Sequence, residues 1–253
     1  QRNENSISFS EQQLPIVISN DGFIELNSKS SESVSYRPSL FQKNFNLDNL
    51  VGKDGVLEYS TDGFLQKIDV RNNAVKSSLF IQNSPECTNG EYVVNEELIV
   101  PNGSKLNFNS EKGKWINGLW KGSVEILNEK NEVISTLCGA ICIDDQKEFF
   151  LASYSFSPIQ NNKIKVSIHI EEQWLTATSR SYPVEIDPLV TGPISVWNGG
   201  YMPSCFMPQY NVDSIQVNVP AGVTVTGLLV QASYYADPFT AAWMSDGSMY
   251  FST

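Results

Sequence analysis

The single histidine, His169, is the first side chain whose chemistry has to be considered. It lies between Ile168 and Ile170 in a run of alternating apolar residues. A Ser-His-Asp or Cys-His catalytic set would have to be built on it, yet the sequence has no Gly-x-Ser-x-Gly turn and no cysteine-protease signature. We therefore expect His169 to occupy a solvated strand face, and we predict no catalytic residue and no enzymatic activity.

Acidic side chains raise the two further options of glycoside hydrolysis and Ca²⁺ binding. Asp144-Asp145 and Glu171-Glu172 are candidates for a catalytic carboxylate pair by proximity alone, but such doublets are more often strand ends that face water. An acidic secreted sandwich often binds Ca²⁺ through oxygen ligands, so Ca²⁺ is kept as an option, although the sequence lacks an Asp-x-Asp-x-Asp-Gly loop. We predict no metal site; the carboxylates considered for Ca²⁺ are Asp187, Asp213, Asp237 and Asp246.

Aromatic residues around a glycine pair suggest a binding loop. In the stretch Trp197-Asn198-Gly199-Gly200-Tyr201, two glycines between aromatic residues indicate an exposed loop. Exposed rings stack on sugar faces, so Trp197, Asn198 and Tyr201 are the predicted ligand-binding residues. Trp174, beside Leu175, is expected in a core instead.

The four cysteines are Cys87, Cys138, Cys142 and Cys205. They lack CxxC spacing and histidine partners, which disfavours zinc, so disulfides are expected for an exported chain. Cys138 and Cys142 are four residues apart, about 13 Å in an extended strand, which exceeds the ~7 Å limit for bridging. One of the two is expected to pair with Cys87, and Cys205 with the other or with a cysteine outside this sequence.

Composition and charge place the chain outside the cell and away from nucleic acid. The 253 residues carry a net charge of -11 without a cluster of Lys and Arg, and binding to nucleic acid needs such clusters. No stretch approaches the ~18 apolar residues of a membrane span, so direct membrane insertion is not expected. We expect an extracellular location for the chain.

The elements that position these residues are expected to be strands and tight turns. The runs 64–70 and 163–170 alternate with a period of two, which predicts half-buried strands. Asp-Gly and Asn-Gly signals such as 61–63 and 101–103 separate the runs and favour hairpins. The pattern predicts an all-β chain of tandem antiparallel β-sandwich modules, immunoglobulin-like or jelly-roll-like.

Three segments are predicted. Residues 1–85 form an N-terminal β-rich segment, and residues 86–190 contain the seven or eight short strands of one β-sandwich. Residues 191–253 are richer in Gly, Pro and aromatic residues, and they begin a further sandwich module that ends within a strand-like pattern. We expect the natural polypeptide to continue beyond this point.

One phrase resembles a known group of proteins. Trp174-Leu175, followed by Tyr182-Pro183-Val184-Glu185-Ile186-Asp187-Pro188, is similar to module ends in large exported surface proteins of the Bacteroidetes, including gliding-motility adhesins. The resemblance implies the N-terminal region of a cargo of the type IX secretion system, with the secretion or motility machinery at the outer membrane as partner. It also implies Ser214, in Asp213-Ser214-Ile215, as a glycosylation candidate, and it supplies no catalytic residues.

The function expected from the sequence is therefore that of a non-enzymatic part of a cell-surface adhesin, serving display, attachment or gliding motility. Surface glycans or proteins are the expected ligands. The alternative is a glycan-binding accessory region or pro-region of a secreted hydrolase. Two exposed Trp or Tyr rings in one plane would favour the glycan binder, whereas singly buried rings would favour an adhesin.

Overall fold

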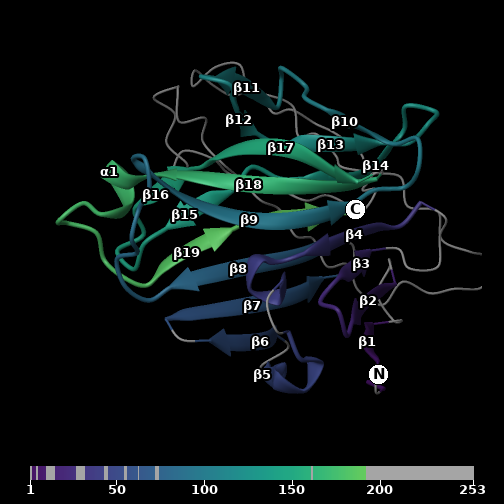
Figure 1. Cartoon of the computed structure of the whole chain (residues 1–253), viewed down its shortest axis with the longest axis horizontal. Helices are drawn as coiled ribbons and strands as arrows, with labels where there is room; N and C mark the ends of the chain where they lie inside the picture. The colour runs from purple at the N-terminus through teal and green to yellow at the C-terminus, as the bar shows by residue number, and fades with distance from the viewer. Residues whose placement is uncertain are drawn as a thin grey trace, which may run out of the picture. The chain divides into compact units, whose positions relative to one another are not determined.

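The computed structural model describes residues 2–3, 5–9, 15–26, 32–42, 45–53, 56–61, 63–71, 74–160 and 162–191. Within these ranges the chain forms strands that pair antiparallel in two sheets (Figure 1). The predicted all-β sandwich class is confirmed. The helical elements of this part are the short η1 (Ser39–Gln42), η2 (Leu47–Asn49) and α1 (Glu172–Leu175), and none has the length and apolar character needed to cross a membrane.

The first sheet, sheet A, has the two longest described strands at its centre. Its strand order is β1-β2-β3-β4-β9-β18-β17-β12-β11. The bounds in that order are Ser6–Phe9, Ile16–Ser19, Ile24–Leu26, Val34–Arg37, Glu91–Ile99, Lys163–Glu171, Ser153–Gln160, Leu119–Gly122 and Gly113–Ile116.

The second sheet, sheet B, is built around the long strand β8, which pairs with two short strands along one edge. The members of the sheet are β5 (Val51–Lys53), β6 (Val56–Thr61), β7 (Phe64–Arg71), β8 (Ala74–Ile81), β10 (Lys105–Asn107), β13 (Val124–Leu127), β14 (Val133–Leu137), β15 (Ile141–Ile143), β16 (Phe149–Leu151), β19 (Val184–Asp187) and β20 (Leu189–Thr191). Strands β5, β6, β7 and β8 pair successively. One half of β8 then pairs with β20 and the other half with β19, and the Ser77 N–H donates to the Pro188 carbonyl at the break.

Alternating side chains explain why these strands bury one face. In β18 the residues Val166, Ile168 and Ile170 are buried and belong to the core cluster, while His169 between them faces the other way. The predicted runs at 64–70 and 163–170 correspond to β7 and β18. The predicted turn at 61–63 is also confirmed, because β6 and β7 pair from Thr61 to Phe64 around Gly63.

The predicted boundary between residues 85 and 86 is wrong. Strand β4 from the first predicted segment pairs with β9 from the second, and β8 pairs with β19 and β20. The two segments share both sheets and one hydrophobic core. The chain divides instead into two compact units, residues 1–195 and 196–253, and the third predicted module, 191–253, lies almost entirely outside the described residues.

Candidate functional site

A row of three hydrogen-bonded side chains crosses three neighbouring strands of sheet A. His169 Nε2 lies 2.8 Å from Ser155 Oγ, and His169 Nδ1 lies 2.8 Å from Glu91 Oε2. Glu91 is on β9, His169 on β18 and Ser155 on β17. We call Glu91, His169 and Ser155 the histidine row.

Strand register brings these three residues together. His169 faces Ser153 on β17 and Val93 on β9. Ser155 follows Ser153 by two residues and Glu91 precedes Val93 by two, so both are diagonal neighbours of His169. Such diagonal neighbours lie about 7–8 Å apart, within reach of a histidine ring and a glutamate. The row therefore needs no special backbone conformation.

The row lies on the face of sheet A opposite the core. The His169 side chain is 17% exposed and that of Glu91 is 38% exposed, so the expected solvated position of His169 is corrected to a half-buried one with two partners. With its proton on Nδ1, the imidazole donates to the Glu91 carboxylate and leaves Nε2 to accept the Ser155 hydroxyl proton. Chemically, this is a hydroxyl in contact with a base that a third group orients.

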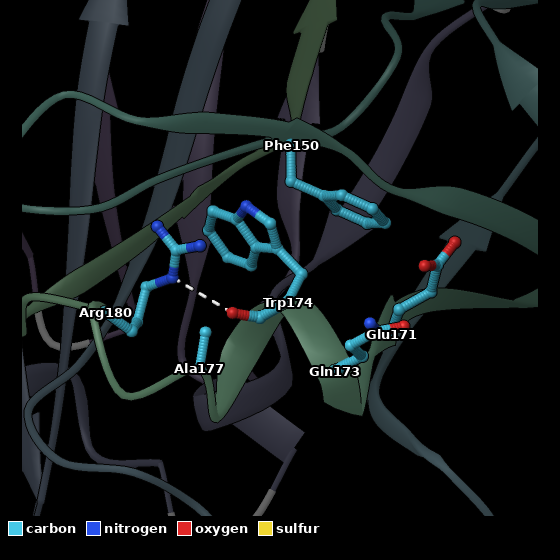
Figure 2. Close-up of a pocket in the computed structure, with 6 residues that line it drawn as sticks. All are labelled: Phe150, Glu171, Gln173, Trp174, Ala177 and Arg180. Carbon is cyan, nitrogen blue, oxygen red and sulfur yellow. Dashed lines mark hydrogen bonds between the residues drawn. The ribbon is translucent and has the colours of Figure 1, made fainter.

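A shallow pocket of about 290 Å³ lies near the end of the same strand (Figure 2). Its lining residues are Phe150, Glu171, Gln173, Trp174, Ala177 and Arg180. Glu171 is two residues beyond His169 on β18, so strand alternation places both side chains on the same face of sheet A. Glu171 therefore connects the pocket to the strand that carries His169.

Trp174, which the sequence placed in a core, is half-buried and packs against the core. Its ring and that of Phe150 lie between two cationic side chains. The Arg180 guanidinium carbon lies 3.7 Å from the centre of the Trp174 ring, and Figure 2 shows the two side chains together. The Phe150 ring is 5.3 Å from the Trp174 ring at an interplanar angle of 28°. Lys121 Nζ lies 5.0 Å from the centre of the Phe150 ring. The Trp174 ring already packs against Arg180 and Phe150, so it is a poor platform for stacking a sugar.

Arg180 is held in this stack by acidic partners. Its guanidinium lies 2.7 Å from Asp144 Oδ2 and 3.2 Å from Glu148 Oε2. Burial raises the pKa of Asp144, but hydrogen bonds from the Glu148 N–H and from Arg180 outweigh it and place this pKa below its usual range. Asp144 is therefore a buried ion-pair partner and not a strand end that faces water, whereas its neighbour Asp145 is exposed.

The residues predicted for ligand binding and glycosylation cannot be placed. Trp197, Asn198, Tyr201 and Ser214 all lie outside the described residues, as do the Ca²⁺ candidates Asp213, Asp237 and Asp246. The fourth Ca²⁺ candidate, Asp187, forms an ion pair with Lys76 at 3.0 Å. In the described part of the chain, no three His, Cys, Asp or Glu side chains form a group that could hold a metal ion.

The expected disulfide of Cys87 with Cys138 or Cys142 is corrected, because all three residues have free thiols. Cys142 is fully buried on β15, whereas Cys87 precedes β9 and contacts the Pro85 carbonyl. Burial raises the pKa of Cys138 to about 11 and raises that of Cys142 further, which keeps both thiols protonated and unreactive. Cys205 lies outside the described residues.

The histidine row was missed because its members are far apart in sequence. Glu91 and His169 are separated by 78 positions, and no local pattern connects them. Ser155 and His169 are closer in sequence, because β17 and β18 are consecutive strands that pair with each other. Comparison of the chain with protein-family models, curated protein sequences and solved structures found no match.

Proposed function

We propose that this chain is a display and attachment module of an exported bacterial cell-surface protein, acting by contact rather than by catalysis. The observation that carries the proposal is the placement of β20 inside sheet B. Thr191 pairs with Thr136 of β14 on one side and with Ala74 of β8 on the other. Residues 192–253 continue directly from this strand, so a load on them is passed to strands on both sides.

The surface properties support the same proposal. A net charge of -11 favours solubility and weak non-specific sticking. Three of the large apolar side chains that are exposed in the described residues, Trp115, Phe149 and Val51, lie on different strands. Specific attachment in such a protein belongs to loops and local sites held by the sandwich. The proposed partners are surface glycans or proteins and the secretion or motility machinery at the outer membrane.

The alternative, a glycan-binding accessory region of a secreted hydrolase, depends on the loop at 197–201. In the described part of the chain, Trp115 is 53% exposed, but it packs edge-on against the buried Trp120 at 5.4 Å. This geometry is not the coplanar pair of exposed rings expected of a glycan platform, so the attachment module is preferred.

A glycan-array experiment on the purified chain separates the two functions. The wild type and Trp197→Ala are compared with and without Ca²⁺, and Trp115→Ala is the control for loss of an exposed indole. Specific binding that is lost only in Trp197→Ala would favour the glycan binder. The attachment proposal expects Trp197→Ala to leave the binding pattern unchanged, with the search for a ligand then turning to proteins.

A further inference from the structure

We propose that Ser155 is an activated hydroxyl that accepts an acyl group from an activated ester, with His169 as the base and Glu91 as the positioning residue. This inference goes beyond the proposed attachment function and does not depend on it. A single acyl transfer to the protein is a binding reaction of one group per chain, so it is compatible with a module that acts by contact.

The geometry of the histidine row carries the inference. The 2.8 Å contacts on both ring nitrogens place Ser155 and Glu91 on opposite edges of the His169 imidazole. A hydroxyl is a weak nucleophile until a base removes its proton, and a base is effective when a third group fixes its ring and tautomer. Glu91 and His169 meet both requirements for Ser155.

Neighbouring serines on the same strand lack this arrangement. Ser153, Ser155 and Ser157 are spaced two residues apart on β17, so all three face away from the core. Ser157 is exposed, whereas Ser155 is half-buried, yet the histidine contact belongs to Ser155. Reactivity caused by exposure would therefore favour Ser157, and reactivity caused by the base would favour Ser155.

The chemical step balances without an external oxidant or reductant. Ser155 Oγ attacks the ester carbonyl carbon and forms a new C–O bond, while its proton passes to His169 Nε2. The bond from the carbonyl carbon to the leaving oxygen then breaks, and the leaving group takes the proton from His169. The products are Ser155 acylated at Oγ and one free alcohol or phenol.

The proposal is restricted to acyl donors with a good leaving group because of the energy of the transition state. Preorganised donors for the developing oxyanion are usually the largest contribution to acyl transfer, worth roughly 10²–10³ in rate for each donor. A reagent with a good leaving group depends less on that contribution. The pocket that Glu171 and Gln173 line lies at the end of the strand that carries His169.

The test uses a fluorophosphonate, which reacts with activated serines and leaves a stable adduct. Ser155 Oγ forms a P–O bond, the P–F bond breaks and fluoride leaves, so the adduct can be located by peptide mass. We expect labelling at Ser155 and not at the more exposed Ser157. Labelling should be lost in Ser155→Ala and retained in the matched control Ser157→Ala.

Three further variants separate base catalysis from structure. His169→Gln keeps a hydrogen-bonding side chain but removes the base, and it should slow labelling by about 100-fold, the lower end for general-base catalysis. Glu91→Gln should slow labelling less, and Glu91→Asp should recover part of the loss. Labelling rates are compared only among variants whose melting temperature equals that of the wild type.

Three results would overturn the proposal. The first is the absence of any adduct at Ser155 in the folded wild type. The second is equal labelling of Ser155 and Ser157, which would mean that exposure alone sets reactivity. The third is an unchanged labelling rate in His169→Gln. None of these results bears on surface attachment, so the proposed function would remain open to its own test.

Discussion

At the residue scale, the buried carboxyl group of Glu96 makes the stability of the protein depend on pH. Its side chain enters the core from β9, where the Tyr36 hydroxyl donates to it. Glu96 is 1% exposed. Burial raises the pKa of Glu96 from 4.5 to about 8, and the Tyr36 hydrogen bond lowers it only in part. The folded protein therefore keeps a proton that the unfolded chain releases.

This proton makes stability fall as the pH rises. Between the unfolded pKa of 4.5 and the folded pKa of about 8, only the folded state holds the proton. Each pH unit in this window lowers the unfolding free energy by roughly 1 kcal/mol, and the stabilisation by low pH is fully lost above the folded pKa.

Glu96→Gln should remove this contribution, because a neutral amide of similar shape does not titrate. Urea unfolding at pH 5 and pH 7.5 checks it, with the exposed Glu111→Gln as the control for loss of one charge. We expect Glu96→Gln to be more stable than the wild type at pH 7.5, with a smaller advantage at pH 5. An equal difference at both pH values would contradict the raised pKa.

The sequence predicted the strand face of some residues but not their tertiary partners. Alternation correctly placed His169 on the face of β18 opposite the buried Ile168 and Ile170. It could not show Glu91 as a partner, because only tertiary pairing of β18 with β9 brings that carboxylate near. Asp144 was expected to face water because it belongs to an acidic doublet, but its cation, Arg180, lies 36 positions away.

At the element scale, glycines end strands where a side chain would collide with the backbone. Gly122 ends β12 with a φ of +141°, and a Cβ there would lie 2.2 Å from the Lys112 carbonyl oxygen. Gly63, in the β6–β7 turn, has a φ of +78°, but a Cβ there would meet no other atom within 4 Å. Substitution at Gly63 would cause conformational strain alone, whereas substitution at Gly122 would cause both strain and a steric collision.

Gly122→Ala should therefore destabilise the protein more than Gly63→Ala. Conformational strain alone costs about 1–2 kcal/mol, which is our expectation for Gly63→Ala. The added collision should bring Gly122→Ala to about 3 kcal/mol or more. Chemical denaturation measures both values, and equal losses would show that the close approach of Lys112 and Gly122 is wrong.

Strands were more predictable than their ends. The strand runs and the Asp-Gly turn follow from local alternation and turn chemistry, which is why β7, β18 and the turn at 61–63 were expected. The single helical turn α1 was not predicted. Four residues carry too little periodicity to distinguish a helical turn, and α1 is held by tertiary packing of the buried Leu175.

At the scale of the whole molecule, residues up to 85 and residues 86–191 should unfold together. The five tryptophans, the first of which is Trp115, all follow residue 85, so their fluorescence reports only on the later part. Ile68 is fully buried on β7, in the earlier part. Ile68→Ala should cost about 2–5 kcal/mol and shift the fluorescence transition, because the core is shared.

The measurement uses a background in which Trp197 and Trp243 are replaced by Phe, so that only tryptophans of the described region report. The exposed Val51→Ala serves as the control in the earlier part and should leave the midpoint nearly unchanged. A fluorescence midpoint that does not change in Ile68→Ala would support the predicted division at residues 85 and 86 into two independent segments. The sequence could not exclude that organisation, because the pairings that join the segments connect strands far apart in the chain.

The central claim is that this sandwich is displayed outside the cell as an attachment module. Immunolabelling of the cells that produce this protein, with antibodies against the folded chain, tests it most directly; intact cells, permeabilised cells and a cytoplasmic protein as the control are compared. We predict that intact cells are labelled as strongly as permeabilised ones. Labelling that appears only after permeabilisation would contradict surface display and with it the proposed function.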